Sequence, residues 1–583
     1  MIESALAQQV TALGTLVVLV GLLIHGRFRP GLLFAAALAW CYLLGLIRLE
    51  PMLHNFVNPA LVTLVMLVLY SVVLERTGLV RSVVDRLLHG GYRAALARLM
   101  ASVGLMSAFL NNTAVVAALM GRIRGQARFA PSRLLIPLSF AAILGGTLTL
   151  VGTSTHLILN GFVIDAGLSP LGMFDFLPVG LLLLGAGTLY MVVVAPWLLP
   201  VHQEKASESP RFFVEAQVEP GSPLVGRSVQ ENGLRQLHTL FLAELIRDGK
   251  LTSPVSPQEV LEPGDVLVFS GALEDAEVLG GFAGLKLIDG DHEQLLRSNL
   301  VEVIVSAGSV LIGRRIREAN FRARFDAAVV GVRRGNQQLS GGLGPIRLRA
   351  GDNLVLATGP DFASRENLDR NFHVLSDLGR RRQLGPRAGL AAFGGFALVI
   401  GAAALGVMPL FDGLLILLAS ALVARWVTVA ELRRRFPYEL VIIIGSALGL
   451  AQVLRSTGSA ALLAEGIDWL FAGWGLFGAL VSVYLLTWLL TELITNNAAA
   501  ALAFPVAYAL AQAYQVDPMP FILTVAYAAS ASFMSPYGYQ TNLMVRAAGR
   551  YEFTTFLRIG TPLAFLTGLL VLVFVPVFHP FSG

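Results

Sequence analysis

Two blocks of long apolar segments, separated by a polar stretch, constrain this chain more than any other feature. Most apolar segments in residues 1–200 and 386–583 approach the roughly 20 residues that cross a lipid bilayer, whereas residues 201–385 are polar. With 55% hydrophobic and 14% charged residues, the chain is too apolar for a soluble protein. We therefore predict an α-helical polytopic membrane protein with a water-exposed block between two membrane blocks.

Each membrane block contains five predicted crossings and one interrupted segment. The first block has crossings at 8–25, 30–48, 57–74, 134–164 and 175–200 and an interrupted segment at 95–120. The second has crossings at 388–408, 410–424, 437–453, 518–545 and 558–579 and an interrupted segment at 474–510. We interpret both interrupted segments as re-entrant hairpins. An odd number of crossings then makes the two halves inverted relative to each other.

The loop charges predict the orientation. Eighteen arginines fall in the short loops on one side, and only Arg48 and Arg455 fall on the other. Cytoplasmic loops carry the excess of basic residues, so residues 201–385 should be cytoplasmic and both termini outside the plasma (inner) membrane. The net charge of +5 is modest and its arginines flank apolar segments, so no nucleic-acid partner is expected.

Two polar motifs recur in the two halves in the same order. Ser107-Ala-Phe-Leu-Asn111-Asn112-Thr113 resembles Thr491-Glu-Leu-Ile-Thr495-Asn496-Asn497, 384 residues later. Gly152-Thr153-Ser154-Thr155-His156 resembles Gly538-Tyr539-Gln540-Thr541-Asn542, 386 residues later. Two ordered matches at nearly one offset indicate an inverted repeat.

These interruptions suit ion binding. Irregular polar backbone at membrane depth is tolerated only where protein or a water-filled cavity surrounds it. Carbonyl, hydroxyl and asparagine oxygens can replace the hydration shell of Na⁺, and helix N-termini attract anions. The alternative is packing: asparagines hydrogen-bond between membrane helices, and small residues such as Gly145, Gly146, Gly152 and Gly538 let helices approach closely.

The sequence leaves the roles of two ionisable residues open. Glu492 lies beside the second asparagine motif, where it could carry a coupling proton or act as a solvated or hydrogen-bonded group near the hairpin mouth. His156 could donate to a substrate or pack as a satisfied core histidine. No nucleophile, base and orienting group fall together and no metal-ligand cluster occurs, so an enzyme is not expected.

The middle block contains a second repeat. Residues 214–271 resemble residues 303–359, and both contain Gly-Ser, Gly-Arg and Gly-Asp elements at matching positions. Alternating apolar strands with glycine turns predict a regulatory α+β block of two domains, 201–290 and 291–385. A glycine-rich dinucleotide motif after a strand is absent from the sequence.

These motifs carry a family resemblance. The two middle stretches resemble tandem TrkA-C (RCK-C) domains, and the membrane halves resemble the divalent anion:sodium symporter family of the ion transporter superfamily. The resemblance implies a homodimer, Na⁺ as the coupling ion without another cofactor, and a small cytoplasmic ligand such as a nucleotide at the middle domains. Relatives with such an insert are associated with sulfate, so a sulfate-like oxyanion is favoured and a dicarboxylate is second.

The resemblance also implies site residues. The two Na⁺ sites would comprise Ser107, Asn111, Asn112 and Gly152, and Thr491, Ile494, Asn496 and Ser535. The substrate-binding candidates are Asn112, Thr113, Thr153, His156, Asn496, Asn497 and Asn542. The predicted function is Na⁺-coupled symport of a divalent anion by alternating access. A Na⁺/H⁺ antiporter and an RCK-gated channel are the alternatives, although this chain lacks the selectivity-filter sequence that is typical of potassium channels.

Overall fold

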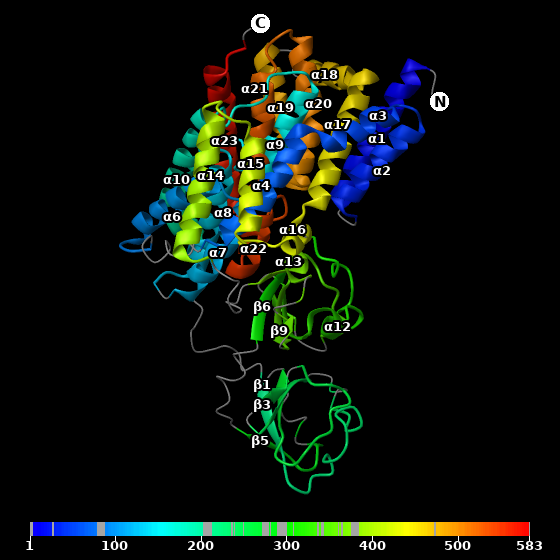
Figure 1. Cartoon of the computed structure of the whole chain (residues 1–583), viewed down its shortest axis with the longest axis vertical. Coiled ribbons are helices and arrows are strands. Elements are labelled where there is room, and N and C mark those ends of the chain that lie inside the picture. The colour runs from blue at the N-terminus through cyan, green and yellow to red at the C-terminus, as the bar shows by residue number, and fades with distance from the viewer. Residues whose placement is uncertain are drawn as a thin grey trace.

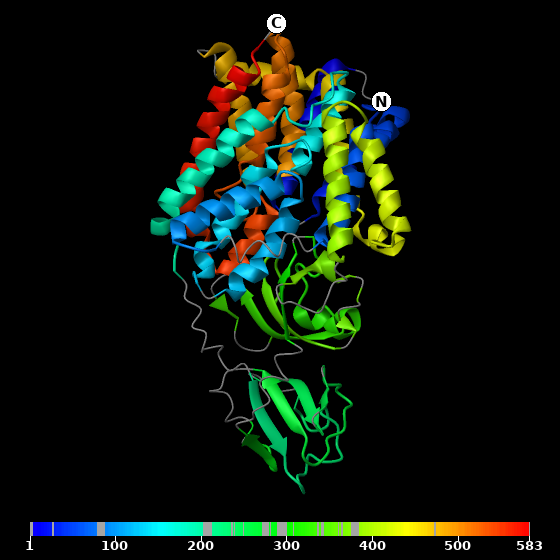
Figure 2. The ribbon, with the colours of Figure 1, turned by 60° about the vertical axis from the view of Figure 1, so that its left-hand side comes forward.

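The computed structural model has an elongated shape with helices at one end and two β-sheets at the other (Figures 1 and 2). It describes residues 4–581 except 26–27, 78–87, 127, 202–212, 235–236, 238–239, 249, 253, 271–278, 280, 289–299, 307, 335–336, 340–342, 360, 363–364, 366, 375–383 and 471–473. The second sheet lies next to the helices and the first sheet lies beyond it.

The helical part combines the two blocks at either end of the sequence. The first block has α1 (Ala5–His25), α2 (Pro30–Leu43), α3 (Leu49–His54), η1 (Asn55–Val57), α4 (Pro59–Glu75), α6 (Tyr92–Ser107), α7 (Asn112–Gly125), η2 (Pro131–Arg133), α8 (Leu135–Gly146), α9 (Ser154–Asp165) and α10 (Leu177–Leu198). The second has α14 (Pro386–Ala404), α15 (Leu410–Val423), α16 (Val429–Arg435), α17 (Tyr438–Ser456), α18 (Ser459–Leu470), α19 (Gly475–Leu493), α20 (Asn496–Ala513), α21 (Met519–Ser530), α22 (Gln540–Gly549) and α23 (Phe553–Phe578).

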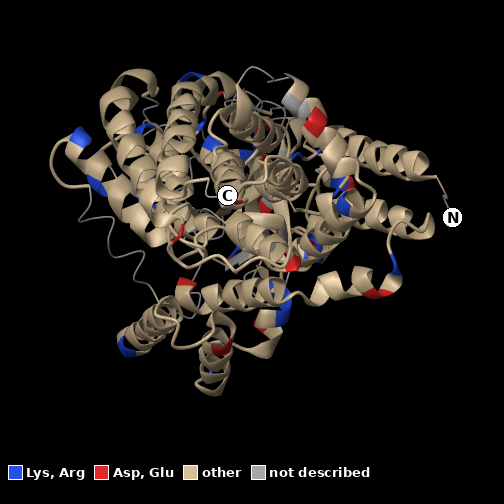
Figure 3. Cartoon of the chain, turned by 90° about the horizontal axis from the view of Figure 1, so that it is seen from above, with Lys and Arg blue, Asp and Glu red and all other residues tan. Residues whose placement is uncertain are grey.

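Several of these helices are membrane spans by length and composition. Among the described residues, seven segments are long and apolar enough to cross a bilayer: 5–25, 49–75, 177–198, 386–404, 438–456, 475–493 and 553–578. Seen from above, the helices carry few charged residues (Figure 3). These features confirm a polytopic helical membrane protein, while the inversion of its halves stays a prediction.

The two crossings that contain the second motif are broken. The segment predicted at 134–164 divides into α8 and α9 around residues 147–153, and the segment predicted at 518–545 divides into α21 and α22 around residues 531–539. The 12-residue helix α18 was not anticipated. Its sequence includes Glu465 and Asp468, which interrupt the apolar run, so a search for continuous apolar segments does not find it.

The described residues of the middle block form two antiparallel sheets of the same topology. The first has β1 (Phe213–Val218), β2 (Phe241–Arg247), β3 (Lys250–Thr252), β4 (Val266–Ser270) and β5 (Leu285–Ile288) in the order β3-β2-β4-β1-β5. The second has β6 (Leu300–Val305), β7 (Ala327–Arg334), β8 (Gln337–Gln338), β9 (Asn353–Thr358) and β10 (Phe372–Val374) in the corresponding order β8-β7-β9-β6-β10. Short helical turns η4 (Ile316–Glu318), α12 (Phe321–Phe325) and α13 (Leu368–Asn371) accompany it.

Equivalent ion pairs stabilise the two sheets. Arg247 pairs with Asp265 at 2.8 Å in the first sheet, and Arg334 pairs with Asp352 at 2.7 Å in the second. Each sheet has its own hydrophobic core. An α+β middle region is therefore present. The domain boundaries and the TrkA-C resemblance stay predictions, and the boundary at 290/291 and the end of the first repeat at Gly271 lie outside the described residues.

Candidate functional site

Four helices begin within one region of the helical part. α7 and α20 follow the tips of the α6–α7 and α19–α20 hairpins, and α9 and α22 follow the two helix breaks. Asn111 caps α7 by accepting a hydrogen bond from the Thr113 amide at 2.9 Å, and Thr495 caps α20 by accepting from the Ala498 amide at 3.4 Å. Free amides and the helix dipole make such N-termini favourable for anions.

Contacts between the first turns of these helices are reciprocal. Thr113 at the start of α7 hydrogen-bonds to Gln540 at the start of α22, with 3.4 Å between the oxygens. Asn497 and Ser154 are the equivalents of Thr113 and Gln540 in the sequence repeat, and they also meet. The Ser154 hydroxyl of α9 donates to the Asn497 side chain of α20 at 2.8 Å. Each hairpin therefore contacts the broken helix of the other half.

Two asparagines of the motifs lie at this junction. The Asn112 amide is fully satisfied when its oxygen faces the Tyr539 hydroxyl at 3.0 Å and its nitrogen faces Ser107 and the carbonyl oxygens of Ala142 and Gly152 at 3.3 and 3.2 Å. Asn496 donates instead to the Thr155 hydroxyl of the first broken helix at 3.1 Å.

Thr153 and Tyr539 join the two breaks. Their hydroxyl groups lie 3.2 Å apart, and they occupy equivalent positions in the sequence repeat. Both side chains are buried. The two broken helices therefore meet through a pair of hydroxyl groups, next to Asn112.

Glycines allow the hairpins to approach the breaks. A Cβ atom added to Gly152 would lie 2.4 Å from the Gly146 carbonyl oxygen and 3.0 Å from that of Ala108. A Cβ atom at Gly538 would lie 2.1 Å from the Ser532 hydroxyl and 2.4 Å from the Thr491 carbonyl oxygen. Both positions therefore require glycine, because backbone cannot move away from a Cβ atom as a flexible side chain can.

The structure brings some predicted Na⁺ ligands together. Ser107, Asn112 and Gly152 form one contact group, whereas Asn111 is an exposed helix cap. In the second half, the Thr491 hydroxyl donates to the Ala529 carbonyl at 2.6 Å, and the buried Ile494 is the C-cap residue after α19.

Glu492 connects the end of α19 to the segment that contains Ser535, another predicted ligand of the second Na⁺ site. Its carboxylate accepts hydrogen bonds from the backbone amides of Phe533, Met534 and Ser535 at 3.1, 3.0 and 2.8 Å. These amides belong to the break between α21 and α22. A carboxylate that accepts three backbone hydrogen bonds holds the hairpin against the unwound segment, which favours the hydrogen-bonded alternative for Glu492 over a proton carrier.

Two predicted substrate ligands make their contacts within the core. The His156 ring is fully buried, stacks on Phe176 with 3.8 Å between ring centroids, and its Nδ1 lies 2.9 Å from the Thr149 carbonyl oxygen. Asn542 accepts from Ser139 at 2.7 Å and donates to the Ser532 carbonyl at 2.8 Å. The contacts of Asn542 favour a structural role, whereas the buried Nε2 of His156 has no hydrogen-bond partner among the described residues. Substrate binding by either residue stays a prediction.

Sequence reasoning did not select Tyr539, Ser154 or Gln540 as site residues, although all three fall in the repeated motif. The available signal was the repeat itself, which aligns Tyr539 with the selected Thr153.

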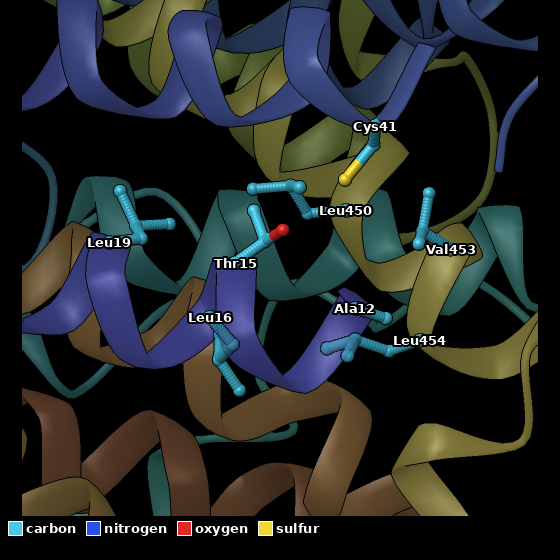
Figure 4. Close-up of a pocket in the computed structure, with 8 residues that line it drawn as sticks. All are labelled: Ala12, Thr15, Leu16, Leu19, Cys41, Leu450, Val453 and Leu454. Carbon is cyan, nitrogen blue, oxygen red and sulfur yellow. The ribbon is translucent and has the colours of Figure 1, made fainter. Parts of the chain in front are cut away.

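A separate apolar cavity lies between α1, α2 and α17 (Figure 4). None of the predicted site residues lines it; its lining comprises Ala12, Thr15, Leu16, Leu19, Cys41, Leu450, Val453 and Leu454.

Comparison with known proteins identifies the family. Residues 1–526 match the family described as CitMHS, citrate transporter. The chain belongs to the CitMHS citrate transporter family. This CitMHS protein is therefore a multi-pass membrane transporter and not an enzyme, in agreement with the resemblance to anion:sodium symporters.

Individual relatives resemble this CitMHS protein over most of its length. It is 31% identical to the "Putative sulfur deprivation response regulator" of Chlamydomonas reinhardtii, over 94% of this chain and 98% of the relative. It is 32% identical to the "Uncharacterized transporter sll0640" of Synechocystis, over 90% of each chain. It is 24% identical to the "Probable sodium/sulfate cotransporter 3" of Chlamydomonas reinhardtii, over 91% of this chain and 84% of the relative.

Proposed function

We propose that this transporter couples uptake of a divalent anion to Na⁺, with a sulfate-like oxyanion as the favoured substrate and a dicarboxylate as the second choice. The observation that carries the proposal is the convergence of four helix N-termini: Thr113 contacts Gln540, Ser154 contacts Asn497, and Thr153 contacts Tyr539 between the two pairs. The groups that meet there are hydroxyls, amides and backbone N–H groups, which can bind an oxyanion without a basic side chain.

Neutral oxygen ligands near the same junction support Na⁺ coupling. Ser107, Asn112 and Gly152 gather on the first side, and Thr491 and Ser535 flank Glu492 on the second. Hydroxyl, amide and carbonyl oxygens are suited to Na⁺. Relatives named sodium/sulfate cotransporters provide further support for both the cation and the anion.

The same arrangement supports alternating access. Reciprocal contacts between the hairpin of one half and the broken helix of the other are what an inverted repeat around a central site would produce. We place the protein in the plasma (inner) membrane, with the two sheets cytoplasmic, both termini outside, and a homodimer as the working unit. The sheets would regulate transport through a small cytoplasmic ligand such as a nucleotide.

Uptake into proteoliposomes tests the proposal. Sulfate, succinate and citrate uptake would be measured with an inward Na⁺ gradient, with an inward proton gradient, and with neither, for the wild type and for Asn112→Ala and Asn496→Ala. We expect Na⁺-dependent sulfate uptake that both substitutions abolish. Na⁺-dependent succinate or citrate uptake without sulfate uptake would reassign the substrate, and uptake driven only by protons would reject Na⁺ coupling.

A Na⁺/H⁺ antiporter is the alternative function that a particular residue supports. Glu492 lies within the helical part beside the second motif, where a carboxylate could carry protons. Its three backbone hydrogen bonds oppose this role, because protonation would weaken all of them. Proton movement driven by Na⁺ without any anion uptake would favour the antiporter. Ion currents far above carrier turnover would favour the channel.

A further inference from the structure

The strand β6 of the second sheet presents different residues on its two faces. Val301, Val303 and Val305 are buried in the core of their own sheet. Successive side chains of a strand point to opposite faces, so Glu302 and Ile304 lie on the other face. Ile304 is fully buried and belongs to the hydrophobic cluster of the helical part. One face of β6 therefore packs against the membrane helices.

Glu302 makes a polar contact from the same face. Its carboxylate pairs with Arg124 near the end of α7 at 2.7 Å and also accepts from Asn353 of β9 at 2.6 Å and from Arg333 of β7 at 3.3 Å. The ion pair therefore links a hairpin helix to the centre of the second sheet. Arg124 contacts one oxygen of this carboxylate and Arg333 contacts the other.

A turn of the second sheet makes the third contact. Gly351 has a φ of +81°, and a Cβ atom added there would lie 2.9 Å from Leu543 of α22. The equivalent glycine of the first sheet, Gly264, has a φ of +87° and no atom within 4 Å of an added Cβ. The two glycines share a backbone conformation, and only the one in the second sheet touches a membrane helix.

The two helices contacted by Glu302 and by the turn at Gly351 are those that begin at the candidate site. α7 starts at Asn112 and reaches Arg124 near its end, and α22 starts beside Tyr539 and places Leu543 about one turn further on. A helix rises 1.5 Å per residue, so α7 is a rod of about 20 Å between the site and the second sheet. Figure 1 shows α7 and α22 at the end of the helical part that faces β6.

We propose that Glu302, Ile304 and Gly351 form a docking face through which the second sheet moves as one body with α7 and α22. This inference rests on the proposed transport function and names the surface through which the middle block reaches the site. Separating the parts during each cycle would expose Ile304 to water and leave Glu302 and Arg124 without each other, so both contacts favour joint movement.

Hydrogen exchange of the full-length protein in lipid nanodiscs tests the docking face independently of transport. Gly351→Ala and Glu302→Gln should accelerate amide exchange severalfold in residues 112–125 and 540–549, relative to the wild type. Gly264→Ala is the matched control, because it imposes the same backbone strain in the first sheet without the Leu543 contact, and it should leave both helices unchanged. Equal exchange of these helices in Gly351→Ala, Glu302→Gln and the control would overturn the proposal.

Cross-linking tests joint movement. In a Cys41→Ala background without native cysteine, Arg124→Cys and Glu302→Cys would be joined with a short bifunctional maleimide, and anion uptake by the same preparation would be measured before and after. At least half of the uptake should remain after cross-linking. Arrest of uptake would show that the sheet leaves the hairpin during the cycle and would overturn the proposal. Absence of uptake in the wild type would instead reject the proposed function, and the exchange measurement would still decide whether the docking face exists.

Discussion

The hydroxyl groups of Thr153 and Tyr539 lie 3.2 Å apart, so residues at equivalent positions of the two halves contact each other directly. The flanking contacts, Thr113 with Gln540 and Ser154 with Asn497, are reciprocal around this pair. A contact between equivalent residues is expected on an axis that relates two halves. The candidate site is thus formed by both halves together.

Tyr539→Phe should weaken substrate uptake, in addition to any loss of stability that it shares with its control. The substitution keeps the ring but removes the hydroxyl that faces Asn112 and Thr153. Leaving buried partners unsatisfied costs about 1–3 kcal/mol, so we expect the KM for the transported anion to rise about tenfold. Tyr527→Phe is the control, because it removes another buried hydroxyl, bonded to the Phe176 carbonyl at 2.8 Å. Equal KM values for the two variants would argue against a role of Tyr539 at the site.

Glu492→Gln should lower stability without changing the ratio of Na⁺ to anion transported. An amide can replace only part of a carboxylate that accepts three backbone hydrogen bonds, because its NH₂ group faces other donors. The loss should be about 1–3 kcal/mol, measured as a lower melting temperature in detergent. Asp517→Asn is the control, since that carboxylate accepts one amide hydrogen bond, from Met519. A changed coupling ratio in Glu492→Gln would restore the proton-carrier hypothesis.

Gly152→Ala and Gly538→Ala should each prevent close packing of a hairpin against a break. The added methyl groups would lie 2.4 and 2.1 Å from existing atoms, so overpacking should cost about 1–3 kcal/mol or more. Gly401→Ala in α14 is the control, because nothing lies within 4 Å of its added Cβ and alanine favours a helix by up to about 1 kcal/mol. The measurement is the yield and melting temperature of monodisperse protein. Melting temperatures like that of Gly401→Ala would contradict the close approach.

The ion pair between Glu302 and Arg124 should persist at mildly acidic pH. Burial by itself would raise the pKa of Glu302, but Arg124, Asn353 and Arg333 outweigh burial and hold the pKa below its ordinary value. Because the folded-state pKa is lowered, the ion pair contributes its full stabilisation of the folded protein above the ordinary pKa of about 4.3. This stabilisation is lost as the pH falls through the lower folded-state pKa.

Hydrogen exchange in α7 measures this pH dependence. After correction for intrinsic exchange rates, protection of residues 112–125 should be equal at about pH 7 and pH 5.5, because both lie above the ordinary pKa of a glutamate. In the Glu302→Gln variant protection should be lower and equally independent of pH in this range. Loss of wild-type protection between these two pH values would contradict a lowered pKa for Glu302.

Local sequence patterns predicted much of the architecture. Apolar length identifies membrane segments because the bilayer sets one span for every crossing helix. The positions of the breaks around Gly152 and Gly538 were also predictable, because polar residues within apolar runs cannot face lipid. The two sheets followed from alternating residues and glycine turns. The helix α18 was not predicted because Glu465 and Asp468 interrupt its apolar sequence.

By itself, the sequence determined that the chain is a two-block membrane protein with matching polar breaks and a β-rich middle region, because these properties depend on neighbouring residues. Only the tertiary structure decided that Thr153 meets Tyr539, that Glu492 holds residues 533–535, and that Glu302 pairs with Arg124. These partners are 386, 41 to 43 and 178 residues apart in sequence. Local preferences do not specify such distances, and the packing of helices and sheets brings the groups together.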